Sequence, residues 1–579
     1  MIQTNSNDLR TAKGIISLLW PKESIENKEP TVVRQIDATA CRDIELEHLV
    51  QGFKPHGKEM TQWIRLLGSL CADERVIRHR QQVFSDIYEH PVLAELLEDL
   101  LPELQALSYS RTPKSKENDL VFSVTQRLAE LEGLAAIVSS LLGFFKNEHE
   151  TIKSRAFLDL FDELQNIESD PHFRQMMSEV PELLVQLRNV SSVTIGVNLN
   201  HHLQPVQATL LSVNKERFNG QSTNLLNRLM GKTASEFEGI AQLHSVPQKM
   251  IQFNGQTVKL DSDTHGYAVN PMMVPLFKDL NEVLKKTLAP IDHALRKYGR
   301  ISSNRISAIS EEIPFFLGGL RMLKGFVKAG LPVCCPKILA AEQRISRMKS
   351  AYNPNLALAL LIQGKEGKLS SPIVLNDVDM SQNSRVQIIT GPNQGGKTTY
   401  IQAIAHSHIL FQAGFFVPAT EAEMSPVDCL CTHFPTEEKI DRGRGRLGDE
   451  AHRFSRLFEM VTANSLFLLN ESFSSTYSGE SLYMAQDILR ILLKLGTRTL
   501  FATHLHELAA RYEDLNRASD YPDRCVSLVS RVSESGEKRR TYQIVPSQPL
   551  GHSYAKEIAE KFGIAYDQLK DSLKARGVF

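Results

Sequence analysis

The spacing of apolar residues divides the chain into a helical first part and a mixed second part. From about Asp43 to Leu107, apolar residues recur at helical spacing among frequent charged ones, which predicts a series of helices. A charged stretch at residues 111–118 ends this block. The next apolar stripe predicts one helix of roughly 25 residues, used for core packing or as a long arm. It consists of Leu120, Val124, Leu128, Leu131, Leu134, Val138, Leu141 and Phe145.

Strand-like patterns first interrupt the helices and later alternate with them. Residues 193–199 with 208–213, and residues 250–253 with 257–260, have strand character. Helical patterns resume before the prolines at residues 332–336, and from about Lys337 strand-like and helix-like segments alternate, as an α/β nucleotide-binding domain requires. We therefore predict an N-terminal helical segment at residues 1–110, a helical region with short strands at 111–336 and an α/β domain at 337–579.

Composition indicates an ordinary soluble protein of 579 residues, too long for a single core. Its 66 basic and 67 acidic residues balance, so any DNA-binding surface has to be a local patch. The 7 cysteines, including Cys429 and Cys431, lack paired zinc-knuckle spacing and are expected to be reduced thiols. We find neither a signal-type start nor a membrane-length apolar run, and expect a cytoplasmic protein with no membrane partner.

A glycine-rich stretch between a predicted strand at residues 386–390 and a predicted helix at residues 400–413 has the spacing of a phosphate-binding loop. The glycines let backbone N–H groups face a polyphosphate. Lys397 would neutralise phosphate charge, and the Thr398 hydroxyl would bind Mg²⁺. The alternative is a glycine-rich turn with an incidental lysine. The nucleotide-binding candidates are Gly391, Pro392, Asn393, Gln394, Gly395, Gly396, Lys397, Thr398 and Thr399.

Two later strand ends supply candidates for hydrolysis. The apolar run at residues 466–470 ends at Glu471, which we predict to be the general base for an attacking water. Asn470 stands where most such ATPases have an aspartate; we expect it to lie at the metal with Thr398, and the lost charge to slow hydrolysis while ATP still binds. The run at 499–503 delivers His504, a candidate sensor of the γ-phosphate. A chance acidic cap and a structural histidine are the alternatives.

Taken together, these motifs resemble the ATPase domain of the MutS family of DNA mismatch repair proteins. The resemblance rests on residues 390–401, 414–419, 465–471 and 500–508, and more weakly on residues 36–45, 76–83 and 551–559. It implies an α-helical core, lever and clamp followed by a C-terminal ABC-type α/β P-loop ATPase domain. It also implies ATP and Mg²⁺ as cofactors, ATPase activity and double-stranded or branched DNA as a partner.

The resemblance further implies a homodimer in which each ATPase domain completes its partner's site. The counterpart of the partner-facing segment is residues 441–450, where Gly443 and Arg444 would reach a partner's γ-phosphate. A flexible basic loop is the alternative. Gly445 and residues 473–477 depart from the family pattern in elements that couple the two sites.

We expect a shortened family member, because the predicted helical core begins near Asp37 and leaves no room for a mismatch-recognition wedge domain. DNA contacts would then fall between about Lys114 and Arg300. The candidate basic residues, which the alternative treats as a solvated face, are Lys215, Arg217, Arg228, Lys232, Lys285, Lys286, Arg296, Lys297 and Arg300.

Three functions compete. The leading one is a dimeric ATPase clamp acting on mismatched, branched or unusual DNA. The second is a slow or non-hydrolysing nucleotide switch that scaffolds a protein or ribonucleoprotein partner, which Asn470 favours. A transporter-type ATPase subunit is disfavoured by the long fused helical region without a membrane segment.

Overall fold

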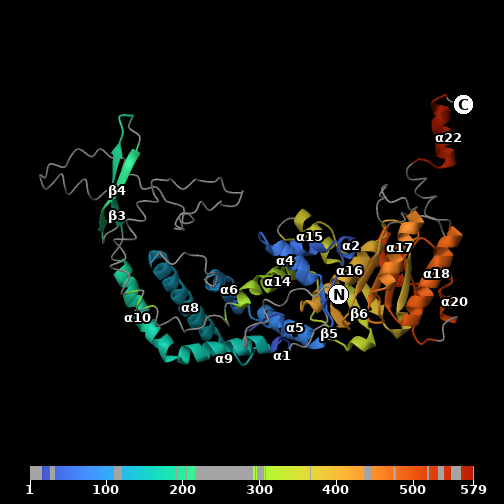
Figure 1. The fold of residues 1–579 in the computed structure, drawn as a ribbon. Coiled ribbons are helices and arrows are strands. Elements are labelled where there is room, and N and C mark those ends of the chain that lie inside the picture. Colours follow the sequence, from blue (N-terminus) through green and yellow to red (C-terminus); the bar gives the residue numbers. More distant parts are fainter. Residues whose placement is uncertain are drawn as a thin grey trace. The chain divides into compact units, whose positions relative to one another are not determined.

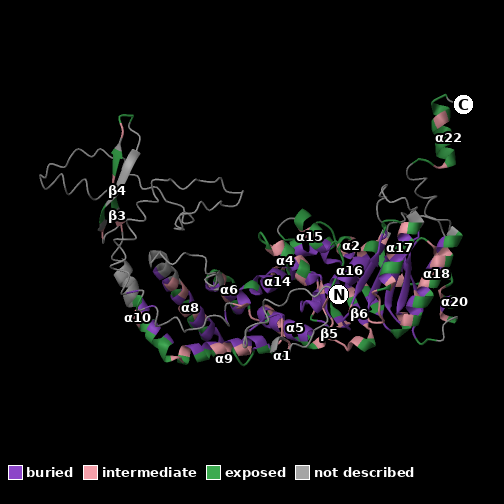
Figure 2. Cartoon of the chain, in the orientation of Figure 1, coloured by how far each residue is buried: buried purple, intermediate pink, exposed green. Residues whose placement is uncertain are grey.

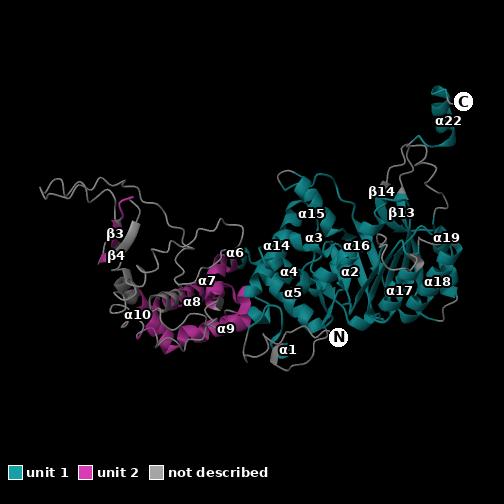
Figure 3. Cartoon of the chain, turned by 45° about the horizontal axis from the view of Figure 1, so that its top comes forward, with its two compact units in different colours: residues 1–95, 152–157, 311–579 teal, residues 96–151, 158–310 magenta. Residues whose placement is uncertain are grey.

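The chain divides into two compact units. The computed structural model describes residues 16–26, 33–109, 120–188, 192–202, 205–214, 291, 293, 295, 306, 308–364, 367–435, 446–473, 478–517, 521–532, 540–549 and 563–577 (Figure 1). The first unit comprises residues 1–95, 152–157 and 311–579, and the second comprises residues 96–151 and 158–310 (Figure 3). The three parts predicted from sequence group the chain differently, and their boundaries stay a prediction.

The second unit contains long helices and a β-hairpin. Its elements are α7 (Leu101–Tyr109), α8 (Leu120–Glu148), most of α9 (Arg155–Ser169), α10 (Pro171–Arg188), β3 (Ser192–Leu199) and β4 (Pro205–Asn214), and α6 (Pro91–Asp99) leads into it. Helix α8 confirms the predicted stripe, whose members from Val124 to Phe145 are buried. Antiparallel β3 and β4 confirm the first strand pair; residues 250–260 and the candidate DNA contacts lie outside the described residues.

The first unit begins with short helices that have clear start signals. Its elements before the sheets are α1 (Lys22–Glu26), β1 (Val33–Gln35), α2 (Ala38–Asp43), α3 (Leu46–Gln51), α4 (Glu59–Leu67), β2 (Ser69–Cys71), α5 (Glu74–Glu89) and α14 (Ile313–Lys328). The short η3 (Ala308–Glu311) belongs mostly to the second unit. The Asp37 carboxylate accepts from the N–H groups of Thr39 and Ala40 at 2.7 and 2.9 Å and so caps α2. Asp73 caps α5 in the same way.

A mostly parallel sheet forms the centre of the first unit. Its strand order is β10 (Leu430–His433), β11 (Leu466–Asn470), β12 (Arg498–Ala502), β8 (Val386–Thr390), β13 (Cys525–Val532) and β14 (Arg540–Pro546), with only β14 antiparallel to its neighbour. Every residue of β8, β10, β11 and β12 is buried (Figure 2), as expected for parallel strands covered on both faces. Strands β8 and β11 have the bounds that the apolar runs predicted.

Helices and a smaller sheet accompany the central sheet. The helices are α15 (Pro354–Gln363), α16 (Lys397–Gln412), α17 (Arg446–Phe458), α18 (Ser478–Leu495), α19 (His506–Ala510), α20 (Tyr512–Arg517) and α22 (Tyr566–Ala575). The smaller sheet has the order β5 (Lys337–Ile338), β9 (Glu421–Met424), β6 (Ser346–Ala351) and β7 (Asn376–Met380). No helix in the described part of the chain is long and apolar enough to cross a membrane.

An aromatic cluster joins the early helices to the end of α16. The ring of Phe415, just after α16, lies 4.9 Å from that of Phe84, 5.2 Å from Phe53 and 5.0 Å from Phe315. Gly319 of α14 permits this approach, because a Cβ there would lie 2.2 Å from the Phe415 ring. Residues far apart in sequence therefore share one core beside the helix that follows the glycine-rich loop.

A buried arginine fixes the start of β12 against the smaller sheet. The Arg498 guanidinium is fully buried and donates to the carbonyls of Ser425, Pro426 and Asn464 at 2.7–2.9 Å, with a longer bond to the Ser346 hydroxyl. Burial lowers its pKa to about 9. Removal of the guanidinium would leave several buried carbonyls without a donor.

We predict that Arg498→Ala lowers the free energy of unfolding by about 4 kcal/mol, because it strands these acceptors. Urea denaturation of the full chain measures this change. Arg490→Ala is the matched control, since the Arg490 side chain is 56% exposed and should change stability by less than about 0.5 kcal/mol. Equal effects of the two substitutions would contradict the anchoring role.

Candidate nucleotide-binding site

The glycine-rich loop connects the buried strand β8 to the first residue of α16. Gly391 and Gly396 have φ of 141° and 90°, values that L side chains rarely adopt. A Cβ on Gly391 or Gly395 would lie 2.7 Å from atoms of Ser530. Ser530 belongs to β13, the strand that pairs with β8. The Ser530 hydroxyl also donates to the Gly395 carbonyl at 2.7 Å. Glycine is thus required for both conformation and space at position 391, for space at 395 and for conformation at 396.

Lys397 lies in this loop as a buried cation. Only 4% of its surface is exposed, and its ammonium donates to the carbonyls of Gly391 and Pro392, each at 3.0 Å. Burial lowers the pKa of Lys397, while the Glu471 charge acts in the opposite direction. A buried ammonium held only by neutral carbonyls is well suited to an anionic ligand.

Thr398 and Asn470 face each other across the sheet end. The Thr398 hydroxyl donates to the Asn470 side-chain carbonyl at 3.4 Å. Hydroxyl and carbonyl oxygens are ligands that Mg²⁺ accepts, usually together with waters and phosphates. These two side chains therefore fit a magnesium site that depends on the nucleotide for charge. The described residues contain no cluster of three or more His, Cys, Asp or Glu that could hold a metal alone.

Glu471 and His504 meet at the ends of adjacent parallel strands. Asn470 pairs in register with Ala502, and therefore both chains leave β11 and β12 at the same edge of the sheet. The Glu471 carboxylate lies 2.9 Å from His504 Nε2. The His504 hydrogen bond lowers the pKa of Glu471, against the raising effect of burial. The carboxylate is therefore ionised at neutral pH, as a base must be.

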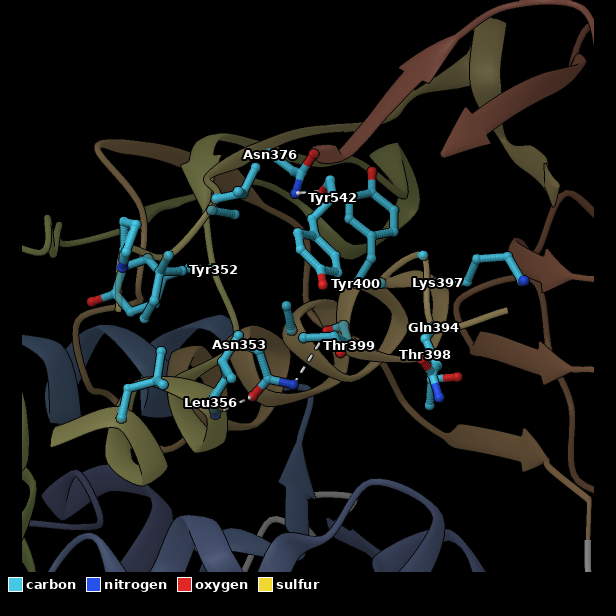
Figure 4. Close-up of a pocket in the computed structure, with 18 of the residues that line it drawn as sticks. Tyr352, Asn353, Leu356, Asn376, Gln394, Lys397, Thr398, Thr399, Tyr400 and Tyr542 are labelled. Atoms are coloured by element: carbon cyan, nitrogen blue, oxygen red, sulfur yellow. Dashed lines mark hydrogen bonds between the residues drawn. The ribbon is translucent and has the colours of Figure 1, made fainter. Parts of the chain in front are cut away.

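One cavity of about 470 Å³ brings most of these residues together. Gln394, Gly395, Gly396, Lys397, Thr398, Thr399 and Glu471 line its polar end. Apolar and aromatic side chains also line the cavity, among them Leu356, Ile373 and Tyr542. Leu356 lies on the far side of the cavity from Lys397, and Tyr542 lies between them beside Gly396 (Figure 4). The cavity thus joins a cationic, phosphate-sized cradle to an apolar recess.

Not every predicted site residue lies at the cavity. Gly391 and Pro392 are buried and accept hydrogen bonds from Lys397, which lines the cavity, whereas Asn393 is exposed in the loop. Gly443 and Arg444 lie outside the described residues. Sequence reasoning missed Ser530 and Tyr542, because neither belongs to a motif and only the strand order brings β13 and β14 to the loop.

Comparisons with known proteins show which family this chain resembles. The family model for MutS domain V matches residues 387–572, and the model for the MutS2 N-terminal domain matches residues 72–328. Similar curated proteins are named DNA mismatch repair protein MutS. The one from Chloroflexus aurantiacus is 28% identical over 316 residues, 51% of this chain and 32% of the relative. The one from Brevibacillus brevis is 37% identical over 154 residues, 26% and 18% of the two chains.

A third relative, from Chlorobium phaeovibrioides, is 33% identical over 199 residues, which is 34% of this chain and 22% of the relative. The matched regions thus span about a third or less of these relatives' lengths. Two family models on consecutive parts of the chain, together with the loop and strand-end geometry, lead to one conclusion: this chain belongs to the MutS family.

Proposed function

We propose that this chain is an ATP-dependent DNA-binding protein that hydrolyses ATP with Mg²⁺. The main support for this proposal is that the glycine-rich loop, the buried Lys397 ammonium and the ionised Glu471 carboxylate all line one cavity. The relatives' shared name, DNA mismatch repair protein MutS, supports DNA as the partner. We also propose that the protein acts in the cytoplasm.

Each polar residue of the cavity has a proposed role. The ammonium of Lys397 would exchange the Gly391 and Pro392 carbonyls for β- and γ-phosphate oxygens, which offer full negative charge. Bound Mg²⁺ would neutralise charge that develops on the phosphates. Glu471 would orient and deprotonate the attacking water, and His504 Nε2 would hold the Glu471 carboxylate through their hydrogen bond.

The apolar end of the cavity suits a nucleobase. Leu356 and Ile373 offer apolar surface there, and the Tyr542 ring adds a flat surface beside Gly396. The backbone of Tyr542 is fixed because Asn376 donates to its carbonyl at 3.1 Å and accepts from the Ile544 N–H at 2.7 Å. The position of Tyr542 therefore depends on β7 and on the β14 edge, and a base would bind against both.

Dimerisation and the DNA contacts are supported by the family alone. Gly443 and Arg444 precede α17 in the chain. In such a dimer they would contact the γ-phosphate of the nucleotide bound by the partner. The acting unit would be a homodimer clamp on mismatched, branched or otherwise unusual DNA.

Asn470 favours a second candidate function, a slow nucleotide switch that scaffolds a protein or ribonucleoprotein. Asn470 is buried beside Thr398, where a neutral amide attracts Mg²⁺ less than a carboxylate would. Slow hydrolysis would prolong the ATP-bound form and suit a switch more than a motor.

We predict that Asn470→Asp increases turnover several-fold and lowers the Mg²⁺ concentration for half-maximal rate by about tenfold, because it restores charge next to Thr398. Steady-state ATP hydrolysis across a Mg²⁺ titration measures both quantities. Asp is nearly isosteric with Asn, so a change in fold is not expected. An unchanged rate and an unchanged Mg²⁺ dependence would refute the assigned metal role.

The two candidate functions differ in DNA binding. We predict that the chain binds branched or mismatched duplexes more tightly than a matched duplex, and that affinity falls at least tenfold between about 50 and about 200 mM salt, as phosphate contacts require. ATP should change the affinity. Equilibrium titrations with labelled DNA of equal length, with and without ATP, measure this. Absence of binding to every DNA at low salt would eliminate the first candidate and favour the scaffold.

A further inference from the structure

The chain turns sharply at the proposed base. Glu471 and Phe473 have φ of 49° and 64°, in the left-handed region that L residues seldom occupy. The Glu471 N–H donates to the Ala502 carbonyl at 2.8 Å, which ties one side of the turn to β12. Such a backbone persists only when surrounding contacts enforce it, so the other side of the turn needs an anchor as well.

The anchor is a hydrogen-bonded pair between Ser472 and His433, the last residue of β10. The Ser472 hydroxyl donates to the His433 carbonyl at 3.1 Å and lies 2.8 Å from His433 Nδ1. Both side chains are almost fully buried. When the single hydroxyl proton goes to the carbonyl, Nδ1 carries a proton and donates to the Ser472 oxygen. The pair thus fixes Ser472 at two points.

Stacked rings hold the next residue of the turn. The Phe454 ring, from α17, lies 4.2 Å from the His433 ring and 4.6 Å from the Phe473 ring. The Ser481 hydroxyl, from α18, donates to the Phe473 carbonyl at 2.6 Å. His433 therefore contacts the turn through Ser472 directly and through Phe454 indirectly.

A buried histidine at position 433 is less favourable for stability than an apolar side chain that only fills the space. Among the described residues its buried Nε2 has no hydrogen-bond partner. Burial and the nearby Arg453 charge lower the pKa of His433 to about 3, which keeps the ring neutral. A phenylalanine would fill this site without an orphaned nitrogen. The specific contribution of histidine is thus the Nδ1 bond to Ser472.

We propose that His433, acting with Ser472, is a positioning residue that holds the Glu471 carboxylate in its catalytic orientation. The inference rests on the proposed ATPase function, since it assigns a purpose to the turn rather than a new reaction. The turn links three elements, because His433 ends β10, Glu471 follows β11 and the Ala502 carbonyl belongs to β12.

The test compares His433→Phe and Ser472→Ala with a matched control, His408→Phe. His408 is also a fully buried histidine that bonds a serine hydroxyl at 2.8 Å, that of Ser346, and its other ring nitrogen also lacks a partner among the described residues. We expect the first two variants to lower kcat about tenfold or more with KM within about twofold, because the water-orienting group is misplaced while nucleotide contacts persist. The control His408→Phe should retain kcat. Thermal melting should show that it is destabilised about as much as His433→Phe.

A double-mutant cycle separates positioning from general damage. In a Glu471→Gln background, His433→Phe should change the residual turnover less than about twofold, since the group it positions is already gone. Native kcat in both His433→Phe and Ser472→Ala, or an equal loss with and without Glu471, would overturn the proposal.

A readout without turnover keeps this inference distinct from the proposed function. Carbon-13 NMR of glutamate-labelled protein follows the Glu471 carboxyl, with Glu471→Gln identifying its resonance. The pKa of Glu471 lies below its ordinary value because of His504, and it should rise toward that value in His433→Phe but not in His408→Phe. An unchanged pKa in His433→Phe would contradict positioning. Unaltered ATP turnover in Glu471→Gln would instead refute the proposed function.

Discussion

The burial of α16 is the constraint on which the first unit depends. The helix begins at Lys397 in the glycine-rich loop, and nearly all its residues are buried. Its polar side chains are bound to the early helices: His406 Nε2 lies 2.6 Å from the Ile44 carbonyl, and Gln412 donates to that of Cys71. A close-packed helix transmits displacement because its neighbours cannot deform around it. The loop and residues 43–71 are therefore held against the same closely packed helix.

The strands around α16 place the chemistry at one edge. Strand β12 lies between β8 and β11, so His504 separates the loop from Glu471 in the order of the sheet. Arg498 fixes the start of β12, and the His433 pair fixes the turn after β11. Under the proposed function, the site thus combines a rigidly held base, Glu471, with a metal position that Asn470 leaves short of charge.

Sequence predicted the parts of this site better than their assembly. The bounds of β8 and β11 followed from continuous apolar runs, because strands buried on both faces have no alternation to blur their ends. The loop followed from glycine spacing. Ser530 and His433 could not be found, since their contacts depend on strand order. The grouping of residues 1–95 with 311–579 depends on long-range packing around Phe415, which periodicity does not encode.

The most direct test of the account is a side-by-side measurement of ATP binding and hydrolysis by the native chain, Lys397→Ala and Glu471→Gln. The account predicts that Glu471→Gln keeps ATP affinity within about threefold while turnover falls at least about 100-fold, because only the base is lost. Lys397→Ala should weaken ATP binding at least about tenfold, because the phosphates lose their buried cation. Native binding and native turnover in both variants would contradict the account.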